Sequence, residues 1–260
     1  MEQNMKILAI GDVVGNSGIE YLSSKLWGMR NSLGADLCIV NGENASDIIG
    51  LSRPDAIRIL NAGADLITLG NHSFGRRDLY PMLDDTEQII RPSNFPAGTP
   101  GIGHTVLRVG GVRVLCINLI GTVNMLSEAS PFSEADRILE REKGNFDLSV
   151  VDFHAEATSE KIALGRYLDG RVSAVFGTHT HVQTADEEIF PRGTAYITDI
   201  GMTGPTNGVI GVDAAISIKK LMTHMPERYK VAEGPVKARG VLFELDEDSG
   251  KAVSIKRIVF

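Results

Sequence analysis

The stretch Met5–Asp12, MKILAIGD, is an apolar run that stops at an acidic residue, and it sets the pattern for the chain. A helix-like segment with a glycine stop follows it over residues 19–34. Further apolar runs alternate with helix-like segments, which predicts an α/β fold with a parallel sheet and right-handed crossovers. Because these runs are continuously apolar, we expect the strands to be buried on both faces.

Later segments depart from strict alternation at two hairpins. Gly110-Gly111 joins two strand-like runs within residues 104–121, and residues 237–260 predict a second antiparallel pair that turns at 247–250. The other expected strands are 36–44, 64–72, 146–154 and 172–181, and the other expected helices are 53–63, 133–144, 159–170 and 213–224. No linker, low-complexity block or repeat divides the chain, so we expect a single domain over residues 1–260.

Composition limits the classes of function. The 260 residues are 43% hydrophobic and 23% charged, as in an ordinary globular protein. The net charge of −7 argues against broad attraction to nucleic acid or anionic membrane, although a local basic patch stays open. Cys38 and Cys116 lie inside apolar runs and are expected to be buried free thiols. With no signal-peptide pattern and no run of about 20 apolar residues, we expect a cytoplasmic protein that does not cross a membrane.

Polar side chains follow the apolar runs where the strands end. These residues are Asp12, Asn41, Glu43, Asn44, Asn71, His72, His154, His179 and His181. Ligands bind outside the carboxyl ends of the strands in parallel α/β sheets, so we expect these side chains to converge. His179 and His181 would share a face if their strand continued through them. Nitrogen and oxygen ligands without thiolate suit iron, manganese or zinc, with cobalt or nickel as further alternatives, and the pattern predicts a metal site.

Each of these residues has a simpler interpretation when it is taken alone. Asp12 could cap the first helix, Asn-Gly at 41–42 could be a turn, and His72 could be a surface histidine. The simpler interpretations do not explain why histidine and carboxylate gather at strand ends. His104 and His224 lie elsewhere, and we expect them at an edge strand and near a helix C-terminus.

A nucleotide-binding loop is the other candidate motif. Residues 11–18, GDVVGNSG, are glycine-rich between a strand and a helix. Val13 stands where the dinucleotide fingerprint needs its second glycine, and no Gly-Lys-Ser/Thr is present. Both nucleotide-loop interpretations are therefore weak, and the metal site is preferred.

The ordered motifs GD, NGEN, GNH, DFHAEATSEK, GTHTHVQTAD and ITDIGMTGP resemble the YmdB-like family of calcineurin-like metallophosphoesterases. The resemblance extends from Gly11 to the C-terminal strands. It implies a four-layer α/β/β/α sandwich with a two-metal centre that holds divalent ions, iron first, with manganese or zinc as alternatives. It also implies a phosphodiesterase that hydrolyses cyclic nucleotides, with 2′,3′-cyclic nucleotides as the expected class, through a hydroxide that bridges the metals.

The same resemblance implies roles for individual residues. One metal would be held by Asp12, Glu43, Asn44 and His181, and the other by Glu43, Asn71, His154 and His179. His72, beside Asn71, would face the substrate and protonate the leaving ribose oxygen. The candidates to orient the ligand imidazoles are Asp152, Glu156, Thr178, Gln183 and Asp199. Val14 stands where many members of the wider superfamily have histidine, and Glu43 replaces their bridging aspartate; both departures belong to the YmdB-like branch.

The implied centre suits an anionic substrate. Two divalent ions beside Asp12 and Glu43 would leave a surplus of roughly two positive charges. Phosphomonoesterase or nucleotidase action on the same metals stays open. So does a regulatory interaction protein in which the metal site is structural or senses a ligand. The sequence is also compatible with a homo-oligomer.

Overall fold

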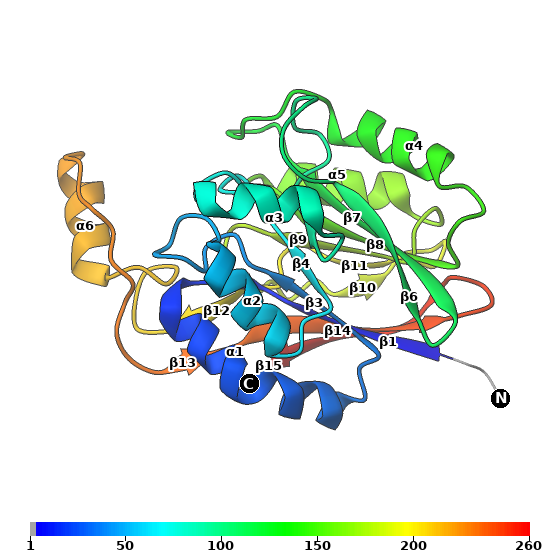
Figure 1. Ribbon diagram of the computed structural model, residues 1–260, viewed down its shortest axis with the longest axis horizontal. Coiled ribbons are helices and arrows are strands. Elements are labelled where there is room, and N and C mark those ends of the chain that lie inside the picture. Colours follow the sequence, from blue (N-terminus) through cyan, green and yellow to red (C-terminus); the bar gives the residue numbers. More distant parts are fainter. Residues whose placement is uncertain (1–3) are drawn as a thin grey trace.

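The computed structural model describes residues 4–260 and contains two six-stranded sheets with helices on their outer sides (Figure 1). The strand orders are β15-β14-β1-β3-β4-β5 and β10-β11-β9-β8-β7-β6. A three-stranded sheet, β13-β12-β2, accompanies them. This arrangement confirms the predicted α/β/β/α sandwich.

The first sheet is parallel except at its C-terminal hairpin. Its parallel strands are β1 (Asn4–Ile10), β3 (Leu37–Asn41), β4 (Leu66–Thr68) and β5 (Ile89–Ile90). The antiparallel hairpin consists of β14 (Arg239–Asp246) and β15 (Ala252–Val259), and β14 pairs with β1. The helices that follow its strands are α1 (Gly15–Leu33), α2 (Arg53–Asn61) and α3 (Tyr80–Asp85), the last preceded by a 3-10 turn (Arg77–Leu79).

The second sheet is parallel in its centre and antiparallel at both edges. Its parallel strands are β7 (Val112–Ile120), β8 (Leu148–His154), β9 (Ala174–Thr178) and β11 (Ala195–Ile197). Its edges are β6 (His104–Val109) and β10 (Glu188–Ile189). Its helices are α4 (Pro131–Arg141) and α5 (Thr158–Leu168). The small sheet contains β2 (Asp12–Val13), β12 (Met202–Pro205) and β13 (Val236–Lys237), and α6 (Ala214–Thr223) follows β12.

Successive residues of a central strand enter different cores. In β1, Leu8 and Ile10 pack with α1 and α2, whereas Ile7 and Ala9 pack between the two sheets. A third core lies between the second sheet and its helices, where Phe153 is fully buried. Both faces of the inner strands are therefore apolar, which confirms the expected burial and explains the missing alternation in the sequence.

Both predicted hairpins form. Gly110 and Gly111 link β6 to β7 with φ of 56° and 95°, as a two-residue turn with both residues left-handed requires. Cys38 and Cys116 are buried free thiols. Within residues 4–260, no helix has the length and apolarity that a membrane crossing requires.

Candidate metal centre

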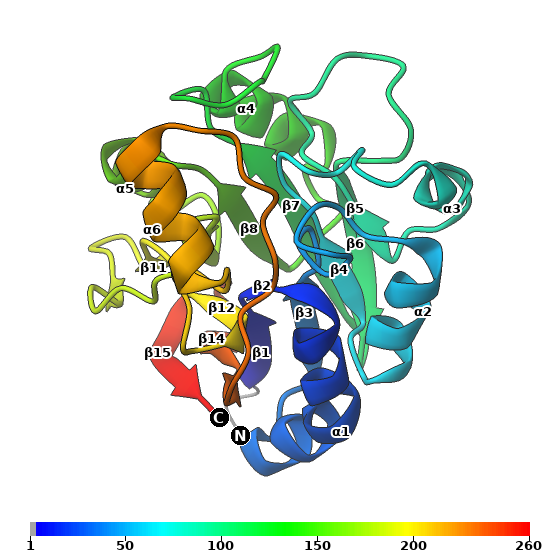
Figure 2. The ribbon, with the colours of Figure 1, turned by 90° about the vertical axis from the view of Figure 1, so that its left-hand side faces the viewer.

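The predicted site residues lie at one edge of the sandwich, where the parallel strands end (Figure 2). Asp12 opens β2 just after β1, and His154 is the last residue of β8. The others stand in the loops after β3, β4 and β9: Glu43, Asn44, Asn71, His72, His179 and His181. Asp12 does not cap α1, whose N-cap residue is Val14 and has no side-chain cap bond. The strand-end rule thus placed these side chains together.

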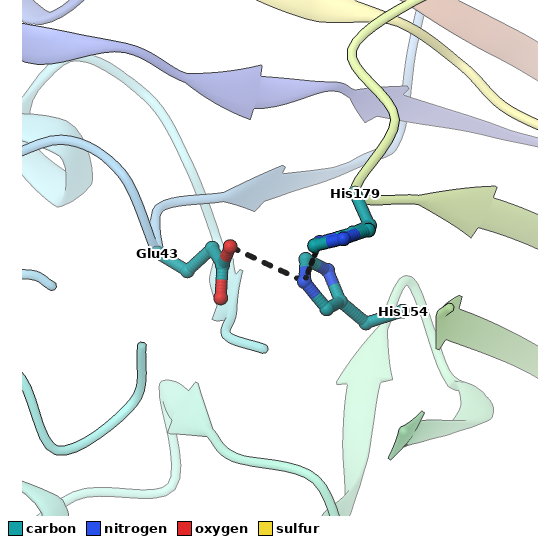
Figure 3. Close-up of side chains that lie close together, drawn as sticks. All are labelled: Glu43, His154 and His179. Atoms are coloured by element: carbon teal, nitrogen blue, oxygen red, sulfur yellow. Dashed lines mark hydrogen bonds and ion pairs between the residues drawn. The ribbon is translucent and has the colours of Figure 1, made fainter. Parts of the chain in front are cut away.

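Glu43, His154 and His179 form the tightest group (Figure 3). Nε2 of His154 lies 3.2 Å from Oε1 of Glu43 and 3.0 Å from Nδ1 of His179. Oδ1 of Asn71 lies 2.9 Å from the same nitrogen. One possible ligand atom from each of the first three residues lies within 4.8 Å of the others. Two nitrogens and two oxygens thus converge, and this donor set suits a divalent cation.

Hydrogen bonds on the outer side of these rings favour the tautomers that bind metal. Nδ1 of His154 lies 2.9 Å from Oγ1 of Thr178, whose hydroxyl donates to Oδ1 of Asp152 at 2.7 Å. Nε2 of His179 lies 2.9 Å from Oε2 of Glu156. We therefore assign the protons to these outer nitrogens, which leaves the lone pairs of His154 Nε2 and His179 Nδ1 directed at the centre.

Asp12, Asn44 and His181 form a second group next to Glu43. Nδ1 of His181 donates to the carbonyl oxygen of Ile210 at 2.9 Å, so its Nε2 faces inward, 3.7 Å from Oδ1 of Asp12. Nδ2 of Asn44 lies 3.1 Å from that nitrogen and 3.0 Å from Oε1 of Glu43. Asn44 would present its oxygen after a 180° turn of the amide group.

The charge balance of this second group fits a cation. Oδ1 of Asp12 is buried and lacks a hydrogen-bond partner among the described residues. Burial raises the pKa of Asp12, because an uncompensated carboxylate is costly in the interior. Burial also lowers the pKa of His154, but the carboxylates of Glu43 and Asp12 outweigh it and raise that pKa to about 9. The raised pKa values of Asp12 and His154 mean that bound protons supply positive charge here. A bound cation would supply that charge in their place.

The loop that carries both neighbouring histidines is not a continuation of the strand. β9 ends at Thr178, and His179 and His181 have φ of 99° and 65°. Because the strand does not continue through these two residues, its geometry does not put their side chains on one face. His179 lies against His154, whereas His181 lies near Asp12, 3.7 Å away. The left-handed backbone is what separates the two imidazoles between the two groups.

A buried ion pair holds this loop. Nζ of Lys161 donates to Oδ2 of Asp199 at 2.8 Å, and the same oxygen accepts bonds from the backbone and hydroxyl of Thr180 at 3.1 and 2.8 Å. Both charged side chains are almost completely buried. Asp199 was predicted to orient a ligand imidazole, and this is wrong, because its carboxylate accepts from Lys161 and Thr180. The sequence analysis did not identify Lys161, although that lysine closes the motif DFHAEATSEK. Buried charges need a partner, and this pair positions the residue between the two histidines.

We expect Lys161→Met to lower the free energy of unfolding of the metal-free protein by about 3–5 kcal/mol, because it leaves Asp199 charged and unpaired. Metal affinity should also fall, since Thr180 loses its support. Denaturant unfolding and metal titration measure both effects. Lys143→Met is the matched control, because that lysine is exposed and pairs with Glu140 at 3.8 Å. Asp199→Asn in the Lys161→Met background should recover part of the loss. A single variant as stable as the control would contradict the role of the pair.

Other histidines and one proposed orienting residue lie outside the centre. His104 opens the edge strand β6, and His224 is the C-cap of α6, as expected. Gln183 was predicted to orient a ligand imidazole, and this is wrong. Its Nε2 donates to the carbonyl oxygens of Gly240 and Ile258, at 2.8 and 3.2 Å, and so ties its loop to the C-terminal hairpin.

Members of both groups line the floor of a cleft of about 460 Å³. Its lining includes Glu43, Asn44, His179 and His181 together with His72. The backbone N–H of His72 donates to Oε2 of Glu43 at 3.0 Å, and its Nδ1 lies 2.9 Å from Oδ1 of Asn44. The side chain of His72 is 35% exposed while that of Glu43 is fully buried. His72 therefore stands between the candidate ligands and the open cleft.

Two sheets packed between helices, with carboxylate, amide and imidazole groups at the strand ends, define a metallophosphoesterase of the calcineurin-like class. The fold is similar to that of a 5′-nucleotidase precursor from Thermus thermophilus, with a TM-score of 0.60 and 14% identity over 99% of this chain and 54% of that chain. The family description "YmdB-like protein" matches residues 8–258, and the chain belongs to this family.

Relatives match along nearly the whole chain. A 2′,3′-cyclic-nucleotide 2′-phosphodiesterase from Bacillus subtilis is 44% identical over 98% of this chain and 97% of its own length. The crystal structure of a hypothetical protein from Thermus thermophilus has a TM-score of 0.93 and 40% identity, covering 98% of this chain and 99% of that one. The predicted family is confirmed.

Proposed function

We propose that the protein is a metal-dependent phosphodiesterase that hydrolyses 2′,3′-cyclic nucleotides. The observation that carries this proposal is the convergence of lone pairs from several strand ends beside the buried Oδ1 of Asp12, which has no hydrogen-bond partner within residues 4–260. Such a donor set at the floor of an open cleft suits cations that bind a phosphoryl group. The name of the Bacillus subtilis relative supports the substrate class and cleavage at the 2′ oxygen.

The chain offers two positions for divalent cations. Asp12, Glu43, Asn44 and His181 would hold one, and Glu43, Asn71, His154 and His179 the other, with Glu43 shared. Iron is proposed first, with manganese or zinc as alternatives. When bound, two such ions would neutralise charge on the phosphoryl oxygens and would lower the pKa of a bound water, so that it could lose a proton and attack phosphorus as hydroxide.

His72 completes the proposed reaction. Its position at the open side of the candidate ligands lets it reach an oxygen of a phosphodiester that lies on the floor. We propose that it donates a proton to the leaving 2′ oxygen, because an alkoxide is a poor leaving group. Thr178 and Glu156 keep the ring nitrogens of His154 and His179 oriented toward the centre.

We expect purified protein to bind about two transition-metal ions per chain, because the candidate donors exceed what one ion uses. Elemental analysis after metal loading measures the ratio. Chelation should abolish hydrolysis and metal addition should restore it. Asp12→Asn should leave about one ion, since Asp12 belongs to one group alone. One ion in the saturated, active wild-type protein would contradict the two-metal proposal.

A hydrolysis panel tests the substrate class. The four 2′,3′-cyclic nucleotides should be hydrolysed faster than 3′,5′-cyclic nucleotides and nucleoside monophosphates, with a 3′-monophosphate as the product. Chromatography identifies the bond that is cleaved. Faster release of phosphate from monoesters would favour the phosphomonoesterase alternative and overturn the proposal.

A further inference from the structure

We propose that one wall of the cleft binds the nucleoside part of the substrate, with Tyr229 and Leu221 as specificity-determining contacts. This apolar wall consists of Ile48, Ile49, Val209, Ile210, Leu221 and Tyr229. The inference rests on the proposed function, because it assumes that the phosphodiester lies on the floor of the cleft.

The apolar wall and the candidate metal ligands line the same cavity. Glu43, Asn44, His179 and His181 form its floor, so a phosphate there has its sugar and base within reach of the wall. The volume of about 460 Å³ lies in the range of small-molecule sites. Figure 2 shows α6 and the chain that returns from it standing beside this edge of the sandwich. Segments distant in sequence, around Ile49 and from Val209 to Tyr229, thus border the same cleft.

Large apolar side chains of this wall are unusually exposed. The exposed fraction is 50% for Ile49, 48% for Ile210, 71% for Leu221 and 41% for Tyr229. Single exposed apolar residues are common, but a contiguous group beside polar catalytic candidates marks a binding surface. A flat group that covers exposed apolar side chains in a cleft binds favourably, and a nucleobase is such a group.

Backbone strain is concentrated in the wall. Ile48 and Ile210 have φ of 74° and 48°, a left-handed conformation that is rare and costly for β-branched residues. Residues held in such conformations cluster at active sites and ligand clamps. At Ile210 the carbonyl oxygen accepts the Nδ1 proton of His181. The same residue therefore orients a candidate ligand and lines the wall.

Tyr229 provides an aromatic surface. Nζ of Lys220 lies 4.0 Å from the centroid of its ring, and the ring lines the cleft. The cation fixes the ring from one side, and a base can stack on the ring without replacing a polar contact. Apart from the Tyr229 hydroxyl, the six side chains of the wall carry no amide or charged group to read a base edge, and Lys220 faces the ring of Tyr229. We therefore expect weak discrimination among the four bases, with purines favoured by their larger area.

A second apolar cleft of about 600 Å³ is the competing position for the base. Its lining includes Phe74, Phe95, Met125 and Leu126, and it reaches the candidate metal centre at Asn71. One candidate metal ligand lines this second cleft, whereas four line the cleft with the apolar wall. The phosphate and the base would therefore lie farther apart if the base used this second cleft.

Tyr229→Ala and Leu221→Ala test the inference in the metal-loaded enzyme. We compare kcat/KM for 2′,3′-cyclic AMP with that for glycerol 1,2-cyclic phosphate, which has the ring diester but no base. Each variant should lose about 10–100-fold on the nucleotide, mainly through KM, and much less on the glycerol diester. Metal content should stay as in wild type.

Two control variants match these changes. Tyr167→Ala removes an equally exposed tyrosine that also lies under a cation, Arg171 at 5.0 Å. Leu126→Ala removes an exposed leucine from the second cleft. Both controls should keep the preference for the nucleotide. A loss of preference in Leu126→Ala but not in Leu221→Ala would move the base to the second cleft and overturn the inference.

Further outcomes separate this inference from the proposed function. Equal losses on both substrates would mean that the wall supports the centre and does not bind the nucleoside. If the wild-type enzyme hydrolyses no cyclic nucleotide, the proposed function fails, and calorimetric binding of 3′-AMP decides the inference. Tyr229→Ala should then weaken 3′-AMP binding about tenfold or more. Unchanged binding, or no binding by the wild type, would overturn it.

Discussion

Glu43→Gln is expected to empty both candidate metal positions and to lower kcat/KM roughly 10³-fold or more. The side chain is fully buried, and its Oε1 lies 3.2 Å from Nε2 of His154 and 3.0 Å from Nδ2 of Asn44. It is thus the residue that both groups share. The amide keeps the shape but removes the negative charge, so each cation loses an anionic ligand.

Elemental analysis and steady-state kinetics measure these two effects on the same preparation. Glu156→Gln is the matched control, because Glu156 is half exposed and contacts His179 on its outer side. That variant should keep both positions and lose about 10–100-fold in metal affinity or activity. If Glu43 merely stabilises a turn, its variant will retain its metal and lose at most about 1–2 kcal/mol of stability. That result would refute the bridging role.

His72→Ala is expected to keep both metals and slow turnover of 2′,3′-cyclic nucleotides roughly 10²–10⁴-fold. His72 lies outside the tight group of Glu43, His154 and His179, and its side chain reaches the open cleft. The loss should shrink for a nitrophenyl phosphodiester, because a phenolate leaves without protonation. Turnover of both substrates under conditions where chemistry limits the rate measures the difference.

His179→Ala is the control for this test, since its imidazole lies 3.0 Å from that of His154 and its loss should remove metal. Comparable metal loss in His72→Ala would make His72 a ligand. An equal penalty for good and poor leaving groups would make it a residue that binds the substrate or stabilises phosphoryl charge. Either outcome contradicts the proton-donor role.

Local patterns in the sequence predicted the elements and the strand-end site well. Apolar runs such as Met5–Ile10 identify inner strands, because each residue enters one core or the other. Glycines marked the ends of helices and hairpins, as Gly34 does for α1 with φ of 63°. The alternation of strands and helices predicted that the inner strands pair in parallel, as they do. The division into two sheets followed from the family resemblance and not from that alternation.

Features that depend on distant residues were not predictable from local patterns. Lys161 is buried because Asp199 faces it, and nothing near either residue in the sequence indicates that pairing. Gln183 lies inside a site motif but contacts the C-terminal hairpin. The apolar wall combines residues around Ile49 with Tyr229, and a periodicity argument within one element cannot detect such a surface.

The position of β1 between β3 and β14 has a consequence for biosynthesis. One side of β1 pairs with residues 240–246 of β14, and the backbone N–H of Gly11, next to Asp12, donates to the carbonyl oxygen of Arg239 at 2.9 Å. A ribosome that adds roughly 5–20 residues per second needs on the order of ten seconds or more to reach that partner. Until then this edge of β1 is open, and an open strand edge is a template for aggregation. In the nascent chain β1 therefore depends on β14 to cover this edge, and the bond from Gly11, beside Asp12, cannot form before Arg239 has been made.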